Sequence, residues 1–302
     1  MWLLDKVWAD MDSLSNPAQM FMAEEMDFNL DDMLYNYGVR INSDLIQDAQ
    51  NYNFIPLEIG NGQGAPQTRP FPWLYYPVLL SYSNHTINRN LDPISSFFVS
   101  SLDTIRTEAI KKTVLLTSSM YSRALKAPVR VHLAGISEQP DLKRFTQQNL
   151  PVAVLLEGKF KSIFRNRIAE SFIRASDTME DLSFKELSNE TKQIIISDGD
   201  MIRNNLRADG SIWPLGYYVV TGQTFANRDF LLNCIEYMAD DSKIIESRNK
   251  EIKVRLLDRV KIKAEKTKWQ IVNVVGPLVL VILFGFTFNA MRNRKYLKYH
   301  SA

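Results

Sequence analysis

The C-terminal end of the chain places the strongest constraint on its fold. The 20 residues from Ile271 to Ala290 carry no charged side chain. A helix rises about 1.5 Å per residue, so a helix of this length spans a hydrocarbon core of about 30 Å. A core helix of a soluble protein should be amphipathic, whereas Val, Leu, Ile and Phe occupy every face of this segment. We therefore interpret residues 271–290 as a transmembrane helix, in which Gly276 and Pro277 permit a local kink.

Charge is distributed unevenly along the chain, although the formal net charge is only +2. Residues 1–60 hold eleven acids and two bases, whereas residues 248–302 hold thirteen bases and three acids. Nine of these bases fall between Arg248 and Lys268, directly before the span, where they suit anionic lipid head groups. A nucleic-acid interface is disfavoured, because this basic stretch lacks interleaved aromatic residues and adjoins no DNA-binding motif.

Composition and motifs exclude several classes of protein. The single cysteine, Cys234, excludes an intrachain disulfide and a structural zinc cluster. The sequence contains no GxxxxGK[ST] phosphate-binding loop and no GxSxG nucleophile elbow. We therefore assign no catalytic residue, no cofactor and no metal ligand from the sequence.

Apolar, β-branched runs recur through residues 1–241 and predict strands. The predicted strands are Trp2–Leu4, Val39–Ile41, Phe54–Ile59, Val114–Thr117, Val129–Leu133, Val152–Leu156, Ile194–Ser197 and Tyr217–Thr221. Several are nearly continuous in Val, Ile and Leu, which is typical of strands covered on both faces. Because helical patterns alternate with these strands, the sequence predicts an α/β fold with a largely parallel sheet.

Two helices are predicted in the same region. The first, Leu30–Tyr37, follows Asn29 as a potential N-cap and ends before Gly38. The second, Asn227–Met238, has its apolar residues on one face.

The remaining segments complete the expected organisation. Gly60–Pro77 is rich in glycine and proline and predicts a loop. We expect an α/β domain in residues 1–241, a basic juxtamembrane stalk helix in 242–270, the span in 271–290 and a basic tail in 291–302.

Two predicted strands end in polar residues. One runs into Ser118 and Ser119, and the other runs into Asp198, Gly199 and Asp200. In open α/β sheets ligands bind outside the carboxyl ends of strands, so these serines and aspartates are candidate ligand or turn positions. The two aspartates could supply oxygen ligands to a divalent ion. Alternatively, Asp198 caps the following helix and Gly199 makes the turn.

Long stretches of the chain resemble one protein family. The segments ISDGDMIRNN, TGQTFANRDFLLNCIEYM and SRNKEIKVRLLDRVKIKAEKTKWQIVNVVGPLVLV resemble the C-terminal half of the gliding-motility-associated GldG proteins of Bacteroidetes. Earlier segments agree, among them DFNLDDMLYNYGVRINSDLIQD, IKKTVLLTSSMYSR and PVAVLLEGKFKSIFRNR. The resemblance covers essentially all 302 residues.

The resemblance implies an auxiliary component of an ABC-type transport system. It implies a glutamine-amidotransferase-like α/β domain held outside the bacterial cytoplasmic membrane, with an ABC permease and its ATPase as partners. Family members also have a preceding transmembrane helix and a further N-terminal region, so we expect this chain to be an N-terminally truncated counterpart. Within the span, Gly276, Gly285, Asn273 and Asn289 favour close approach of a partner helix.

Two alternative functions remain open at the level of sequence. An enzyme built on the amidotransferase-like fold would need its cysteine on a sharp turn after a strand, whereas Cys234 falls inside a predicted helix. A lipid-surface protein would be recruited by the basic stalk and would need no protein partner. We expect a non-enzymatic accessory subunit.

Overall fold

The computed structural model describes residues 1–59, 67–107, 109–165, 184–239 and 259–297. The chain divides into two compact units, Met1–Val254 and Arg255–Ala302. The expected boundary between domain and stalk, at residues 241 and 242, lies outside the described residues. The two units are described in turn.

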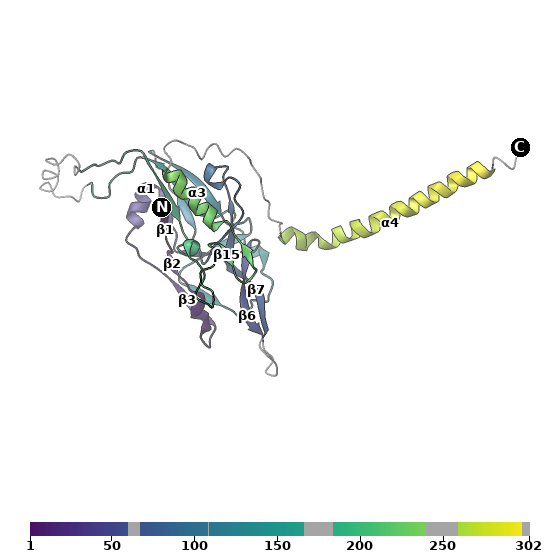
Figure 1. Cartoon of the computed structure of the whole chain (residues 1–302), viewed down its shortest axis with the longest axis horizontal. Coiled ribbons are helices and arrows are strands. Elements are labelled where there is room, and N and C mark those ends of the chain that lie inside the picture. Colours follow the sequence, from purple (N-terminus) through teal and green to yellow (C-terminus); the bar gives the residue numbers. More distant parts are fainter. Residues whose placement is uncertain (60–66, 108, 166–183, 240–258, 298–302) are drawn as a thin grey trace. The chain divides into compact units, whose positions relative to one another are not determined.

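The first unit is a mixed α/β domain (Figure 1). Its strands are β1 (Trp2–Leu3), β2 (Val7–Trp8), β3 (Met20–Glu25), β4 (Val39–Ile41), β5 (Asp44–Asp48), β6 (Tyr52–Ile59), β7 (Gln67–Ser81), β8 (Ile94–Ser95), β9 (Leu102–Thr104), β10 (Ile110–Thr117), β11 (Ser122–Lys126), β12 (Val129–His132), β13 (Pro151–Gly158), β14 (Thr191–Ile196), β15 (Tyr217–Tyr218) and β16 (Gln223–Thr224). Its α-helices are α1 (Asp31–Tyr37) and α3 (Asn227–Ala239), and its 3-10 turns are η1 (Met11–Ser15), η2 (Thr86–Asn88), η3 (Leu142–Arg144) and η5 (Asp200–Ile202).

One seven-stranded sheet organises this domain. Its strand order is β1-β14-β13-β10-β7-β6, and β8 also pairs with β7. Only β1 and β14 are parallel to each other, and the other pairings in this sheet are antiparallel. The prediction of a largely parallel, amidotransferase-like sheet is therefore wrong for these pairings, although the α/β class is confirmed.

The sheet is covered on both faces, which explains the misleading apolar runs. Ala153 and Leu155 on β13 face one core cluster together with Phe230 of α3. Val154 and Leu156, which alternate with them, face a second cluster together with Leu34 of α1 and residues of β4 and β9. Continuous burial in β13 therefore indicates that both faces are covered, and it does not indicate the direction of the strand.

Helix α1 begins and ends close to the predicted bounds, but its N-cap differs. The capping position is Leu30, without a side-chain cap, and Asn29 adopts a positive φ of 55° in the turn before the helix. Gly38 ends the helix as expected, with φ of 88° in the left-handed region that glycine adopts without strain.

The proline-rich segment predicted as a loop belongs largely to strand β7. Pro70 and Pro72 pair opposite residues of β6. The pairings of β7 with β8 and β10 begin only at Val78. The two prolines thus occupy the part of β7 that pairs on one side only, where a missing N–H removes no second ladder bond. The predicted turn itself, residues 60–66, lies outside the described residues.

The second unit is described from residue 259 onward as one helix, α4 (Arg259–Leu297). It contains the whole predicted span, with Pro277 inside the helix. The earlier part of the predicted stalk lies outside the described residues.

We expect the attachment of α3 to be a large contributor to the stability of the domain. Phe230 is fully buried in the first core cluster, whereas Leu232 on the same helix is 42% exposed. Phe230→Ala should lower the free energy of unfolding by about 3–5 kcal/mol, and Leu232→Ala by about 0.5 kcal/mol or less. Denaturant unfolding followed by circular dichroism measures both changes. Equal losses in the two variants would contradict this packing.

Candidate functional site

The two polar strand ends predicted from the sequence lie at the same edge of the main sheet. Strands β10 and β14 are both antiparallel to β13 between them, so they run in the same direction. Their carboxyl ends nevertheless serve different purposes. Ser118 and Ser119 join an internal hydrogen-bond network, whereas Asp198 and Asp200 join a group of carboxylates.

Ser119 stabilises a buried turn through hydrogen bonds. Its backbone N–H and its hydroxyl each donate to the carboxylate of Asp48, both at 2.7 Å. The same carboxylate accepts the backbone N–H groups of Gln50 and Asn51 at 2.9 and 2.8 Å. Burial raises the pKa of Asp48 in spite of these bonds. The hydrogen bonds of the Ser119 hydroxyl hold strand β5 to the end of β10, so this hydroxyl does not face a ligand.

Ser118 is equally enclosed. Its hydroxyl lies 2.8 Å from that of Ser122 and accepts the backbone N–H of Leu150 at 3.0 Å. It is 1% exposed, so this strand end is a structural junction.

Asp198 is a fully buried carboxyl with one unpaired oxygen. Its Oδ2 accepts the backbone N–H of Phe97 at 3.1 Å, while its Oδ1 has no hydrogen-bond partner among the described residues. Burial is the largest cause that raises the pKa of Asp198 well above its usual range, and the charges of Asp5 and Asp200 raise it further. In the following turn, η5, the N-cap is Gly199 and has no side-chain cap hydrogen bond, so the alternative in which Asp198 caps this turn is not confirmed.

Asp5 completes the group and was missed by the sequence analysis. Its Oδ1 accepts the backbone N–H of Gly199 at 2.7 Å, and burial raises its pKa. A Cβ at position 199 would lie 2.4 Å from Oδ2 of Asp5, so any other residue there would have to displace the Asp5 carboxylate. The parallel pairing of β1 with β14 brings Asp5 to this place. The signal in the sequence that could have identified Asp5 is an acidic residue directly after a short apolar run.

Asp200 is partly exposed and pairs with Arg203 at 3.4 Å. In the sequence, Asp198 and Asp200 were candidate oxygen ligands of a divalent ion. Within the described ranges, no group of three or more His, Cys, Asp or Glu side chains is arranged to hold a metal ion. Asp5 and Asp200 instead line a cavity of about 560 Å³.

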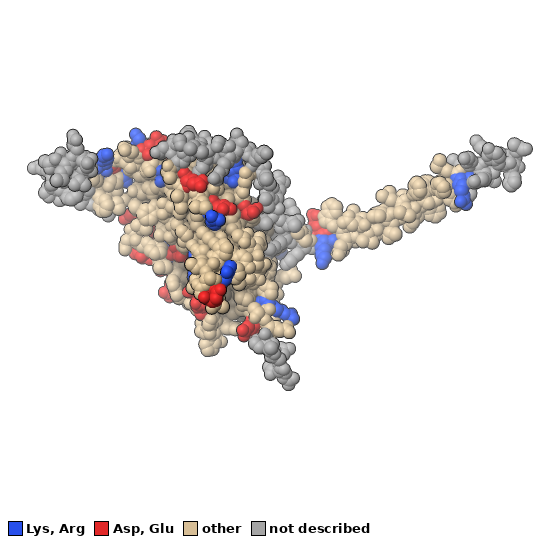
Figure 2. Space-filling view, viewed as in Figure 1, with Lys and Arg blue, Asp and Glu red and all other residues tan. Residues whose placement is uncertain are grey.

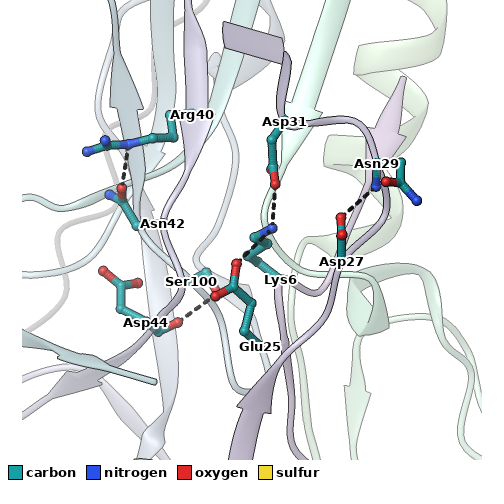
Figure 3. A network of polar contacts seen from close by, with 9 residues as sticks. All are labelled: Lys6, Glu25, Asp27, Asn29, Asp31, Arg40, Asn42, Asp44 and Ser100. Atoms are coloured by element: carbon teal, nitrogen blue, oxygen red, sulfur yellow. Dashed lines mark hydrogen bonds and ion pairs between the residues drawn. The ribbon is translucent and has the colours of Figure 1, made fainter. Parts of the chain in front are cut away.

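A second polar cluster lies beside the first strands (Figure 3). The buried ammonium of Lys6 contacts Asp31 at 2.8 Å and Glu25 at 3.1 Å. Burial lowers the pKa of Lys6, but the bonds to these two carboxylates outweigh it and leave the pKa raised. The neighbouring Arg40 pairs with Asp103 at 2.6 Å. Charges in this cluster therefore satisfy one another, and the cluster ties β3 and α1 to the first strands.

Helix α4 has the properties of a membrane span. Its segment Glu265–Arg292 comprises 28 residues, and an apolar window of 18 residues within it has a mean hydropathy of 2.4 and no buried residue. Ile271 and Ala290 are exposed, and a Cβ added at Gly276 or Gly285 would meet no described atom within 4 Å. Figure 2 shows charged side chains only toward the two ends of this helix.

Titration of Asp198 should be visible in the stability of the protein. Because the folded pKa is raised above the unfolded value of about 3.9, the folded state binds the proton more tightly, and its stability falls as pH rises above about 4. An asparagine at this position carries no such proton. We expect the free energy of unfolding of wild type to fall, relative to that of Asp198→Asn, by about 1.4 kcal/mol for each pH unit between the unfolded and the folded pKa of Asp198. Thermal unfolding across pH 4–9 measures this difference.

Asp141→Asn is the matched control, because Asp141 is an exposed carboxyl outside this group. It should leave the pH dependence of stability unchanged. Parallel stability curves for wild type and Asp198→Asn would contradict the assignment.

Comparison with known proteins places the chain in a family. No curated protein and no solved structure shows significant similarity to it. A family model described as an ABC-type uncharacterized transport system matches residues 1–234, the greater part of the chain. The matched residues include Asp5, Asp198 and Asp200 and most of α3. The protein therefore belongs to the auxiliary family of ABC-type transport systems.

Proposed function

We propose that this protein is a non-enzymatic, membrane-anchored accessory subunit of an ABC transporter complex linked to gliding motility. The observation that carries the proposal is the unburied apolar helix α4 on a chain whose first 234 residues match the transporter-associated family. The link to gliding motility rests on the resemblance to GldG proteins. The partners proposed are the permease and ATPase subunits of the same system.

The surroundings of the candidate nucleophiles support a non-enzymatic role. Cys234 is fully buried inside α3, and burial raises the pKa of its thiol to about 12. A neutral, enclosed thiol is a poor nucleophile. The Ser119 hydroxyl donates to Asp48 and accepts the backbone N–H of Tyr121, so it serves the fold.

The proposed location is the bacterial cytoplasmic membrane, with the α/β domain on the periplasmic side. The orientation rests on the family resemblance, because basic residues flank both ends of the span and the positive-inside rule does not decide. We assign docking of the permease to α4. Gly276 and Gly285 leave room for a neighbouring backbone, and Asn273 and Asn289 offer interhelical hydrogen bonds.

Membrane attachment is tested by extraction. The full chain should remain in the membrane pellet after alkaline carbonate, because insertion of an apolar helix outweighs the attraction of basic residues to lipid head groups. A chain ending at Lys268 should become soluble under the same treatment. Release of the full chain by carbonate would show that α4 does not span the bilayer.

The absence of covalent catalysis is tested by two substitutions. Cys234→Ala and Ser119→Ala should each retain the gliding or transport phenotype once corrected for the amount of folded protein. Ser119→Ala should cost about 1–3 kcal/mol of stability, because it leaves buried partners of its hydroxyl unsatisfied. The chain ending at Lys268 is the loss-of-function control. Loss of function in a substituted protein with wild-type stability would favour an enzyme.

A further inference from the structure

The cavity beside Asp5 and Asp200 is built from segments far apart in the sequence. Residues 3–5 and 7–12 form one wall, the connection between β3 and α1 contributes Met26 and Phe28, and β7 contributes Tyr76. Phe97 and Phe98 follow β8, and the region of η5 supplies Asp200, Arg203 and Asn205. The cavity lies entirely within the first unit and encloses about 560 Å³, which is room for a small molecule or a side chain.

The charge of this cavity is strongly negative. Four carboxylates line it, those of Asp5, Asp10, Asp12 and Asp200, against the single base Arg203. Arg203 lies 3.4 Å from Asp200, so it offsets one of the four. The contrast with the cluster around Lys6 is clear, because that cluster contains its own counter-charges. The cavity therefore favours a cation.

Tyr76 adds an observation that is independent of charge. It is 8% exposed, its ring packs against Phe97 and Phe98 at 4.8 and 5.1 Å, and its hydroxyl has no hydrogen bond to any described residue. Tyr76 lines the same cavity as Asp10 and Asp200. Burial raises the pKa of its hydroxyl, and Tyr218 and these two acids raise it further. Buried tyrosine hydroxyls normally have a partner. This one is positioned to bond a group inside the cavity.

The remaining lining is aromatic and apolar. Trp8 is 49% exposed, and Phe28, Phe97 and Phe98 form further walls. Phe98 is held at φ of 48°, an uncommon conformation for a bulky residue. Aromatic faces attract ammonium and guanidinium groups and also accept the apolar body of a ligand.

We propose that this cavity binds a monovalent organic cation, a primary ammonium or guanidinium group carried on an apolar body. The carboxylates of Asp10 and Asp12, which lie outside the Asp200–Arg203 pair, neutralise the cation, the Tyr76 hydroxyl accepts one of its N–H groups, and the aromatic walls cover the body. No metal-binding arrangement occurs in the described ranges, which favours an organic cation over a divalent ion. This site goes beyond the proposed function and does not depend on the transporter partners.

The proposal is tested by binding of phenethylammonium to the full chain in lipid nanodiscs, measured by saturation-transfer NMR with empty discs subtracted. The neutral isostere 2-phenylethanol measures the contribution of charge. Phenethylammonium should bind, its affinity should fall as salt rises, and 2-phenylethanol should bind at least tenfold more weakly.

Two substitutions localise the site, each with a matched control. Tyr76→Phe removes a hydroxyl that bonds no described residue. Tyr75→Phe removes a hydroxyl from the adjacent position of β7, outside the cavity lining, where it bonds Gln47. Asp10→Asn removes a charge while keeping the oxygen that caps η1, and Asp141→Asn does the same at η3, outside this lining.

Tyr76→Phe should weaken binding about fivefold and Asp10→Asn about tenfold, and both controls should bind as wild type does. Thermal unfolding of each variant separates lost binding from lost folding. The proposal is overturned if wild type binds neither probe, if it binds both equally, or if folded Tyr76→Phe and Asp10→Asn bind phenethylammonium as tightly as their controls.

Discussion

The parallel pairing of β1 with β14 is the contact on which the polar architecture of the domain depends. Trp2 and Leu3 pair with Ile195 and Ile196, and the backbone N–H of Leu4 donates to Ile196 at 3.0 Å. The next residue, Asp5, then meets Gly199. The residue after that, Lys6, turns to the carboxylates of Glu25 and Asp31. A few residues thus build one wall of the acidic cavity and fasten the neighbouring elements.

The electrostatic interactions among Asp5, Asp198 and Asp200 follow from this contact. Asp5 and Asp198 approach each other in a buried place, where two negative charges would repel strongly. The raised pKa of Asp198 favours its neutral form, which removes much of that repulsion. Asp10, Asp12 and Asp200 then face a cavity open to a ligand, with Arg203 as the single base among its lining residues.

Sequence reasoning succeeded where the pattern was local. The apolar runs at Val152–Leu156 and Ile194–Ser197 fall on β13 and β14, and the helix around Cys234 is α3. The direction of the strands could not be predicted in this way, because burial on both faces gives the same run in parallel and antiparallel sheets. The strand predicted at Tyr217–Thr221 is confined to Tyr217 and Tyr218 in β15, where aromatic packing in place of a long ladder accounts for the apolar run.

The candidate site was predicted in part for the same reason. Asp198 and Asp200 were found from their position after a strand, but Asp5 and Tyr76 join them only through the fold, from more than 100 residues away in sequence. Ser119 followed the same strand-end rule but lies in a buried hydrogen-bond network, because its partner Asp48 is on a strand that no local pattern connects to it. Residue type and spacing identify a sheet edge, and tertiary contacts decide which of its polar groups remain available.

Affinity purification from native membranes in mild detergent tests directly whether this protein works as part of an ABC transport complex. An ABC permease and its ATPase should co-purify with the full chain in fixed proportion. Both should be depleted when residues 271–290 are replaced by an unrelated apolar span of equal length. Recovery of the intact full chain free of both subunits, from membranes that contain them, would show that the protein is not part of such a complex.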